Sequence, residues 1–149
     1  VIEYNCRFGD PECQTIMPLM DFNFVNVLYK CAIGDLDGDE KVLSSSKVSG
    51  CVIAASKGYP ENYDVGFPVN FNYKGCEDIQ IFHSGTSKNN EGKIISAGGR
   101  VLSVVCQGKD FDSAFDLAYK VLKGVDFEGI YYRRDIGHQV RKNFSYEDL

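Results

Sequence analysis

The sequence predicts an α+β fold, in which two short helices precede a series of β-strands and one longer helix follows them. Three observations support this prediction. Before residue 35 the apolar residues recur at helical spacing, between residues 48 and 107 they gather in short β-branched runs, and after Asp110 the helical spacing returns. No internal repeat is evident. The 149 residues can form one compact domain, or a small domain with a piece of another.

The first predicted elements are a strand over residues 1–7 and a short helix after it. Asp10 can cap this helix, and Pro11 suits its first position. Pro18 should end the helix after one or two turns. A second helix is expected to end at Gly34, and we expect its apolar stripe to be buried in a core. That stripe consists of Phe24, Val25, Leu28, Tyr29 and Ala32.

A change of composition marks the middle of the chain. Residues 35–46 are polar, acidic and contain glycine and serine, so they are the predicted boundary between two parts of the chain. Strands are predicted beyond this boundary over residues 48–55, 78–83, 93–97 and 100–107. The last of these strands is too continuously apolar for a sheet edge, and it is therefore expected to be central.

The last predicted element is an amphipathic helix that starts at Asp110 and ends near Gly124. Its apolar stripe is expected to pack in the core. The stripe consists of Phe111, Ala114, Phe115, Ala118, Val121 and Leu122. Residues 139–149 are polar and are expected to fray.

Composition argues against several classes of function. The net charge is −5 with acids and bases interspersed, which argues against a general nucleic-acid binder. No apolar run reaches the ~18–20 residues that span a membrane. Because the chain starts at Val1 in a strand-like segment without a signal peptide, we expect a cleaved or truncated product.

The cysteines predict a reducing compartment. All six are dispersed without a Cys-x-x-Cys pair, and we expect most of them to lie in apolar surroundings, as Cys51 and Cys106 do. A cytoplasmic protein with reduced cysteines is therefore expected. A zinc site is not expected, because His83 and His138 are the only histidines and neither lies near a cysteine pair.

The predicted first strand carries a candidate metal and phosphate site. Residues two apart in a strand face the same side, so Glu3, Asn5 and Arg7 would line up on one face. A carboxylate and an amide oxygen are hard ligands that suit Mg²⁺, and an arginine can hold a phosphate in a planar fork. The exposed face of an amphipathic strand would show the same alternation, so the spacing alone leaves both interpretations open.

Five short segments in a fixed order extend this observation over nearly the whole chain. They cover residues 3–14, 57–60, 82–86, 98–102 and 132–137. The first reads Glu-Tyr-Asn-Cys-Arg-Phe-Gly-Asp-Pro-Glu-Cys-Gln, and the last reads Tyr-Arg-Arg-Asp-Ile-Gly. Together these landmark segments resemble the C-terminal part of the phosphoribosylamine–glycine ligases, or glycinamide ribonucleotide synthetases, which are ATP-grasp enzymes.

The resemblance implies a domain organisation. Residues 1–45 would be the end of an ATP-grasp domain, and residues 46–149 would form a small β-rich C-terminal domain that resembles a barrel sandwich. The glycine-rich lid and the ATP-binding lysines of that family lie upstream of these segments. The missing N-terminal part of the same polypeptide is therefore an expected partner, and the isolated chain is expected to be inactive.

The resemblance also implies a reaction. In this family ATP phosphorylates the glycine carboxylate, and the amine of 5-phosphoribosylamine then displaces the phosphate, a step of de novo purine biosynthesis. The protein would be an ATP-dependent carbon–nitrogen ligase with ATP, glycine and 5-phosphoribosylamine as ligands. By their places in the motif, Glu3 and Asn5 would ligate Mg²⁺ or Mn²⁺, and Arg7 would act in catalysis by stabilising the transferred phosphoryl group.

The other landmark segments leave alternatives open. Arg133 and Arg134 could bind the ribose 5-phosphate, or an arginine could form a structural ion pair with Asp135. Arg100 could bind substrate because two glycines precede it, or those glycines could only form a tight turn. His83 is expected to be a hydrogen-bonded structural residue, and the segment 57–60 is expected to form a turn.

Two other classes of function remain possible. A different ATP-grasp carboxylate–amine ligase would share the metal-binding strand but should lack the segments at 98–102 and 132–137. A non-catalytic α+β binding module would use Glu3, Asn5 and Arg7 only as the polar face of a strand.

Overall fold

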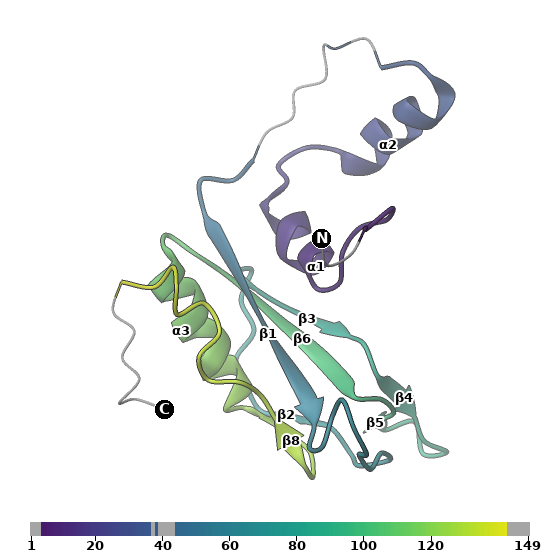
Figure 1. Ribbon diagram of the computed structural model, residues 1–149, viewed down its shortest axis with the longest axis vertical. Helices are drawn as coiled ribbons and strands as arrows, with labels where there is room; N and C mark the ends of the chain where they lie inside the picture. The colour runs from purple at the N-terminus through teal and green to yellow at the C-terminus, as the bar shows by residue number, and fades with distance from the viewer. Residues whose placement is uncertain (1–3, 37, 39–43, 143–149) are drawn as a thin grey trace.

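The computed structural model describes residues 4–36, 38 and 44–142 (Figure 1). Within these residues the fold is α+β, as predicted, with three α-helices, one 3-10 helix and three antiparallel sheets. The main sheet has four strands in the order β3-β6-β1-β8. None of the helices in these ranges is long and apolar enough to cross a membrane.

Residues 4–7 form coil and a bend, so the predicted strand over residues 1–7 is wrong for them. The remainder of that strand, including Glu3, lies outside the described residues. A strand persists where a neighbouring strand pairs with its backbone N–H and C=O groups. The part of the chain that the structure describes provides no such neighbour for residues 4–7.

A short helix follows, as predicted. Helix α1 (Glu12–Ile16) passes directly into a 3-10 turn (Met17–Leu19) that contains the proline expected to end it. The prediction that Asp10 caps α1 is wrong, because Pro11 occupies the N-cap position and no side chain caps the helix. The Asp10 carboxylate instead accepts a hydrogen bond from the side-chain amide of Gln14, with Nε2 3.0 Å from Oδ1.

Helix α2 (Phe24–Ile33) ends where predicted, with Asn23 as its N-cap and Gly34 as its C-cap. Its apolar stripe is exposed, since 75% of Val25 and 63% of Tyr29 is accessible to solvent. The prediction of a buried stripe is therefore wrong for α2. Periodicity indicates that a helix has an apolar face, but it does not provide a neighbour to cover that face. Helix α2 projects away from the sheet (Figure 1).

The main sheet supports the landmark segments. Its strands are β1 (Val48–Ser56), β3 (Ile79–His83), β6 (Arg100–Gly108) and β8 (Ile130–Tyr131). Strand β6 lies between β1 and β3, which confirms its predicted central position. A bulge between Ala54 and Ala55 shifts the register of β1 against β6, so that Ala55 pairs with Arg100 on one side and with Tyr131 of β8 on the other.

Two small sheets complete the β structure. Strand β2 (Asn70–Phe71) pairs with β7 (Val125–Asp126), and strand β4 (Thr86–Lys88) pairs with β5 (Ile94–Ser96). The strands predicted at 48–55, 78–83, 93–97 and 100–107 are thus all present, with bounds that differ by one or two residues.

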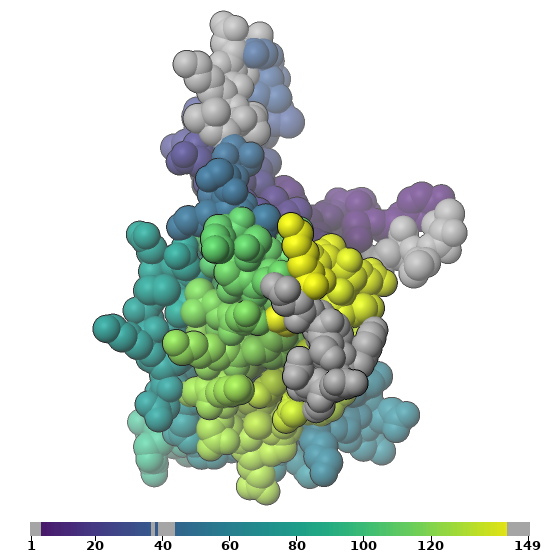
Figure 2. Space-filling model, turned by 90° about the vertical axis from the view of Figure 1, so that its left-hand side faces the viewer, coloured from purple at the N-terminus to yellow at the C-terminus, as the bar shows by residue number. Residues whose placement is uncertain are grey.

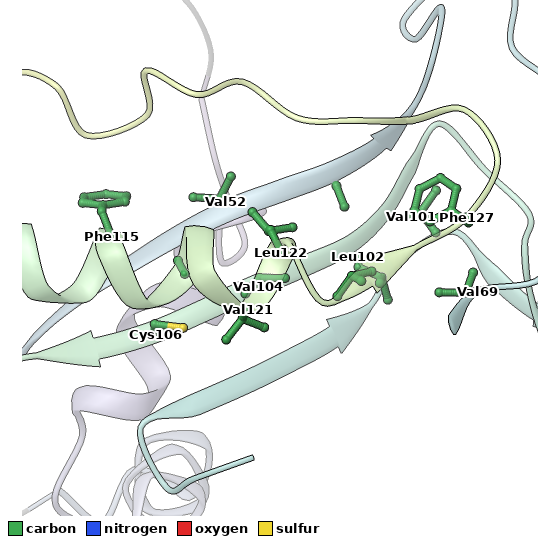
Figure 3. Close-up of a cluster of buried hydrophobic side chains, with 13 residues drawn as sticks. Val52, Val69, Val101, Leu102, Val104, Cys106, Phe115, Val121, Leu122 and Phe127 are labelled. Atoms are coloured by element: carbon green, nitrogen blue, oxygen red, sulfur yellow. The ribbon is translucent and has the colours of Figure 1, made fainter. Parts of the chain in front are cut away.

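Helix α3 (Phe111–Leu122) covers one face of the main sheet (Figure 1). Asp110 caps it as predicted, because its carboxylate accepts a hydrogen bond of 2.8 Å from the backbone N–H of Ser113. The predicted stripe is buried from Ala114 onward, and Leu122 is only 1% exposed. These side chains meet those of β1 and β6 in the core (Figure 3). The core includes Val52, Val101, Leu102, Val104, Cys106, Phe115, Val121 and Leu122.

Phe115 connects three parts of the fold. A Cβ atom at Gly50 of β1 would lie 2.9 Å from this ring, and a Cβ atom at Gly137 would overlap with it. The ring therefore fits only because both of these positions lack a side chain. Beyond residue 132 the chain runs alongside α3 (Figure 2), where Arg141 pairs with Asp112 and Asp116.

The six cysteines are free. The prediction that most of them lie in apolar surroundings is wrong, because Cys6, Cys31 and Cys76 are exposed. Burial raises the pKa of the Cys51 thiol to about 11 and that of Cys106 to about 12. Both thiols therefore remain protonated at neutral pH.

Candidate functional site

Landmark segments that are far apart in the sequence meet at one end of the main sheet. The backbone N–H of Ser84 donates to the carbonyl of Val101 at 3.0 Å, and that of Gly85 donates to the carbonyl of Arg100 at 2.7 Å. Gly85 and Gly98 touch through their backbones, because a Cβ atom at Gly85 would lie 2.7 Å from the Cα of Gly98. The segments 82–86 and 98–102 are therefore joined by direct backbone contact.

The segment 57–60 joins the same cluster and forms the predicted turn. The neighbouring Ser56 donates from its backbone N–H to Gly99 at 2.8 Å and from its hydroxyl to Gly98 at 3.0 Å. The ring of Tyr59 lies against Gly99, where a Cβ atom would overlap with it. On the other side, the backbone N–H of Lys57 donates to the carbonyl of Gly129 at 2.7 Å. This hydrogen bond joins the turn to the residue that precedes β8.

A cavity of about 420 Å³ lies at this junction, between the sheet and the turn that precedes α1. Its floor is apolar and comes from β1, and its walls carry aromatic rings and guanidinium groups. The wall residues are Tyr59, Arg100, Tyr131, Tyr132 and Arg133. A second hollow of about 330 Å³ is lined by residues 131–135, and these include Arg134. Aromatic walls with guanidinium donors suit a small anionic ligand.

Arg100 is bound by the turn before α1. Its Nη2 lies 2.8 Å from Oδ2 of Asp10, and its Nη1 donates to the backbone carbonyl of Asp10 at 3.2 Å. This contact spans 90 residues of sequence, so local spacing gave no signal for it. It connects the first landmark segment with the fourth.

Arg133 forms the ion pair that the sequence left open as an alternative. Its Nε lies 2.9 Å from Oδ1 of Asp135, and its Nη2 lies 2.6 Å from Oδ2. The guanidinium group lowers the pKa of the Asp135 carboxyl, and the carboxylate raises the pKa of Arg133. Two of the five guanidinium N–H groups serve this contact, so three can still reach a ligand.

Tyr119 of α3 fixes the backbone that carries Arg133. Its hydroxyl donates to the carbonyl of Arg133 at 2.9 Å and accepts from the backbone N–H of Ile136 at 3.1 Å. Burial raises the pKa of this hydroxyl, so it remains a donor at neutral pH. The sequence did not point to Tyr119, because its position at the edge of an apolar helical stripe is typical of a core residue.

The described residues of the predicted metal and phosphate site do not line the cavity, and Glu3 lies outside the described residues. Asn5 and Arg7 are exposed. Arg7 donates to the carbonyl of Phe8 at 2.7 Å. Among the described residues no hydrogen bond occupies the amide of Asn5, and no group of three or more His, Cys, Asp or Glu could hold a metal ion.

His83 has the structural role predicted for it. Its Nδ1 lies 3.0 Å from the hydroxyl oxygen of Thr86, and its ring packs edge-on against Phe71 with 6.0 Å between ring centroids. The side chain is exposed and lies outside the cavity.

All residues that line the cavity except Pro11 lie within one known domain. Residues 49–139 match the family described as phosphoribosylglycinamide synthetase, C domain. The chain belongs to this family. The match begins in β1 and ends just beyond the last landmark segment, so it includes the main sheet, α3 and every lining residue of the two hollows except Pro11.

Relatives of this family match a longer part of the chain, including α1 and α2. The phosphoribosylamine–glycine ligase of Synechocystis sp. is 42% identical over 140 residues, which cover 93% of this chain and 33% of the relative. A bifunctional purine biosynthetic protein of Dictyostelium discoideum is 40% identical over 141 residues, which cover 93% of this chain and 17% of the relative.

A solved structure shares the fold. The crystal structure of the phosphoribosylamine–glycine ligase of Thermotoga maritima superimposes with a TM-score of 0.77 at 33% identity, over 91% of this chain and 32% of that protein. The chain therefore spans about a third of the length of such ligases.

Proposed function

We propose that this chain is part of an ATP-dependent ligase that joins glycine to 5-phosphoribosylamine through glycyl phosphate in de novo purine biosynthesis. The observation that supports the proposal best is the convergence of four separate landmark segments on one cavity with guanidinium groups in its wall. Relatives that match across α1, α2 and the sheet are named as this ligase. Their names do not favour another carboxylate–amine ligase or a non-catalytic binding module.

We propose the domain organisation on the same basis. Residues 1–45 are the end of an ATP-grasp domain, and residues 46–149 are a C-terminal domain that resembles a barrel sandwich. The family match from residue 49 onward and the exposed stripe of α2 support a boundary near residue 45. The enzyme works in the cytoplasm, and this chain alone does not turn over, because the upstream ATP-binding residues are needed.

In this proposal the cavity binds the ribose 5-phosphate end of 5-phosphoribosylamine. Arg133 in the cavity wall and Arg134 in the second hollow, which shares Arg133 with the cavity, supply the charge. The N–H groups of Arg133 that Asp135 does not use donate to the phosphate. The Asp135 carboxylate fixes the guanidinium plane before the substrate arrives, which lowers the entropic cost of binding. Arg100 lines the same cavity, and substrate contact stays a prediction for it.

Asn5 and Glu3 would hold Mg²⁺ or Mn²⁺. Of these two residues the structure describes Asn5, and Asn5 suits the ion. Its exposed amide oxygen accepts no hydrogen bond among the described residues. When bound, the ion neutralises charge on the phosphates of ATP. Arg7 would stabilise the transferred phosphoryl group or the acyl phosphate, and its exposed guanidinium can reach a ligand.

The test uses the full-length polypeptide that carries this segment. Glu3→Gln and Asn5→Ala should each lower magnesium-dependent ATP turnover by on the order of 10²-fold or more, because each removes a metal ligand. Asn90→Ala is the matched control, since Asn90 is an exposed asparagine in the turn between β4 and β5 and lines neither hollow. Its turnover should equal that of the parent enzyme.

The cavity is tested separately. Arg133→Gln should raise the KM for 5-phosphoribosylamine and leave the KM for glycine unchanged.

Turnover that stays unaltered in Glu3→Gln and Asn5→Ala would contradict the ligase proposal and favour the binding module.

A further inference from the structure

The turn at residues 9–12 is where the exposed first segment joins the rest of the molecule. Residues 4–7 make no strand pairing among the described residues, and 86% of Tyr4 is exposed. Phe8 packs edge-on against Phe24 at 5.6 Å between centroids. Among the described residues of this segment, the first that is bound to the sheet through an ion pair is Asp10, which follows Arg7 by three positions. The position of Asp10 therefore sets where the segment that carries Asn5 and Arg7 leaves the sheet.

Arg100 holds Asp10 through two different groups. One guanidinium nitrogen pairs with the Asp10 carboxylate at 2.8 Å, and a second donates to its backbone carbonyl at 3.2 Å. A contact to a carboxylate alone would leave the backbone free to rotate. Because main chain and side chain are held at once, the contact fixes the orientation of the turn as well as its distance from the sheet. Gln14 supports the other carboxylate oxygen at 3.0 Å.

The base of Arg100 is itself rigid. Its carbonyl accepts the N–H of Gly85 at 2.7 Å, and its backbone pairs with Ala55 at the bulge. Tyr59 covers the preceding Gly99. The guanidinium therefore extends from a part of the sheet that three landmark segments already fix in place.

We propose that Arg100 is a positioning residue that locks the Asp10 turn onto the C-terminal domain and thereby orients Asn5 and Arg7. The inference rests on the proposed function of Asn5 and Arg7. This positioning role differs from the substrate binding that the two preceding glycines predicted for Arg100. Arg100 lines the cavity in either case. The ion pair is half-exposed, with 36% of the Arg100 and 45% of the Asp10 side chain accessible. Such a pair contributes little to global stability, so its effect should appear in the geometry of the site.

The two roles for Arg100 differ in their kinetic signatures. In the full-length enzyme, Arg100→Gln and Asp10→Ala should each lower kcat by on the order of tenfold, because a small misplacement of a charged group slows the chemical step. The KM for 5-phosphoribosylamine should change by less than about twofold. The double variant should be no slower than either single variant, since both remove the same contact. Arg100→Lys should recover only part of the rate, because lysine cannot hold two groups at fixed angles.

A second readout does not depend on catalysis. Hydrogen exchange of the amides of Cys13 and Thr15, which donate to the carbonyls of Gly9 and Pro11, should accelerate in both single variants of the full-length protein. The matched control is the pair Lys47–Asp78, which is also half-exposed and has a distance of 2.6 Å. Lys47→Gln and Asp78→Ala should leave both kcat and the exchange of Cys13 and Thr15 unchanged.

The outcomes separate the possibilities. A raised KM for 5-phosphoribosylamine in Arg100→Gln, with normal kinetics in Asp10→Ala, would overturn the proposal and show that Arg100 binds substrate. Unchanged exchange at Cys13 and Thr15 in both variants would also overturn it. If the parent enzyme formed no amide, the proposed function would fail, and accelerated exchange would still support the lock between Arg100 and Asp10.

Discussion

Removal of one hydroxyl group tests whether α3 positions the arginines of the cavity. Tyr119→Phe retains the ring, which packs beside Tyr132 with 6.3 Å between centroids. It deletes the donor to the carbonyl of Arg133 and the acceptor of the Ile136 N–H. A hydrogen bond of this kind contributes about 1 kcal/mol net, and an orphaned, half-buried N–H adds to the cost. We therefore expect residues 133–136 to be destabilised locally by about 1–2 kcal/mol.

Native-state hydrogen exchange measures this local change directly. The Ile136 amide should exchange about 5- to 30-fold faster in Tyr119→Phe, which corresponds to the expected 1–2 kcal/mol. The KM for 5-phosphoribosylamine should rise with it, because Arg133 loses its fixed backbone. Tyr73→Phe is the matched control, since Tyr73 also packs against the core but its hydroxyl makes no hydrogen bond among the described residues. Equal exchange at Ile136 in both variants would refute the positioning role of Tyr119.

Three further predictions concern the core, the close contact at Gly99 and pH. Leu102 is fully buried, so Leu102→Ala should lower the free energy of opening of β6 by about 2–5 kcal/mol, measured by exchange at its amides. Gly99→Ala should displace the ring of Tyr59 and weaken 5-phosphoribosylamine binding, and Gly99→Ala with Tyr59→Ala should bind no worse than Tyr59→Ala alone. Arg133 lowers the pKa of Asp135, so the ion pair should stabilise the fold fully at pH values above the ordinary aspartate pKa of about 4. This stabilisation should disappear as the pH falls through the lowered pKa of Asp135. The carboxyl carbon shift of Asp135 against pH would report it, and a midpoint at or above about 4 would contradict the prediction.

Local chemistry made much of the fold predictable. Apolar runs that contain valine and isoleucine specified β1 and β6, and Asp110 specified the start of α3 through a contact only three residues away. The same reasoning failed where the outcome depends on contacts with distant parts of the chain. The stripe of α2 has helical periodicity, yet it is exposed. Residues 4–7 alternate like a strand, but pairing between strands is a long-range interaction, and these residues lack it within the described chain.

The candidate site follows the same division. The landmark segments could be recognised in order, but their convergence could not, because it depends on contacts between distant positions, such as the hydroxyl of Ser56 with the carbonyl of Gly98, 42 residues away. Arg133 and Asp135 are two residues apart, so their ion pair was foreseeable. Asp10 and Arg100 are separated by 90 residues, and their contact was not foreseeable.

The ring of Phe115 has a consequence for how sequences of this family can vary. It presses on Gly50 and on Gly137, so one aromatic side chain restricts two distant positions at once. The two restrictions are not equivalent. Gly137 has a φ of +80°, which disfavours other residues whatever its neighbours are, whereas Gly50 has no such φ and the three atoms nearest to its Cβ position all belong to the ring. In relatives with a smaller residue in place of Phe115, alanine or serine should become acceptable at the position of Gly50, and glycine should persist at the position of Gly137.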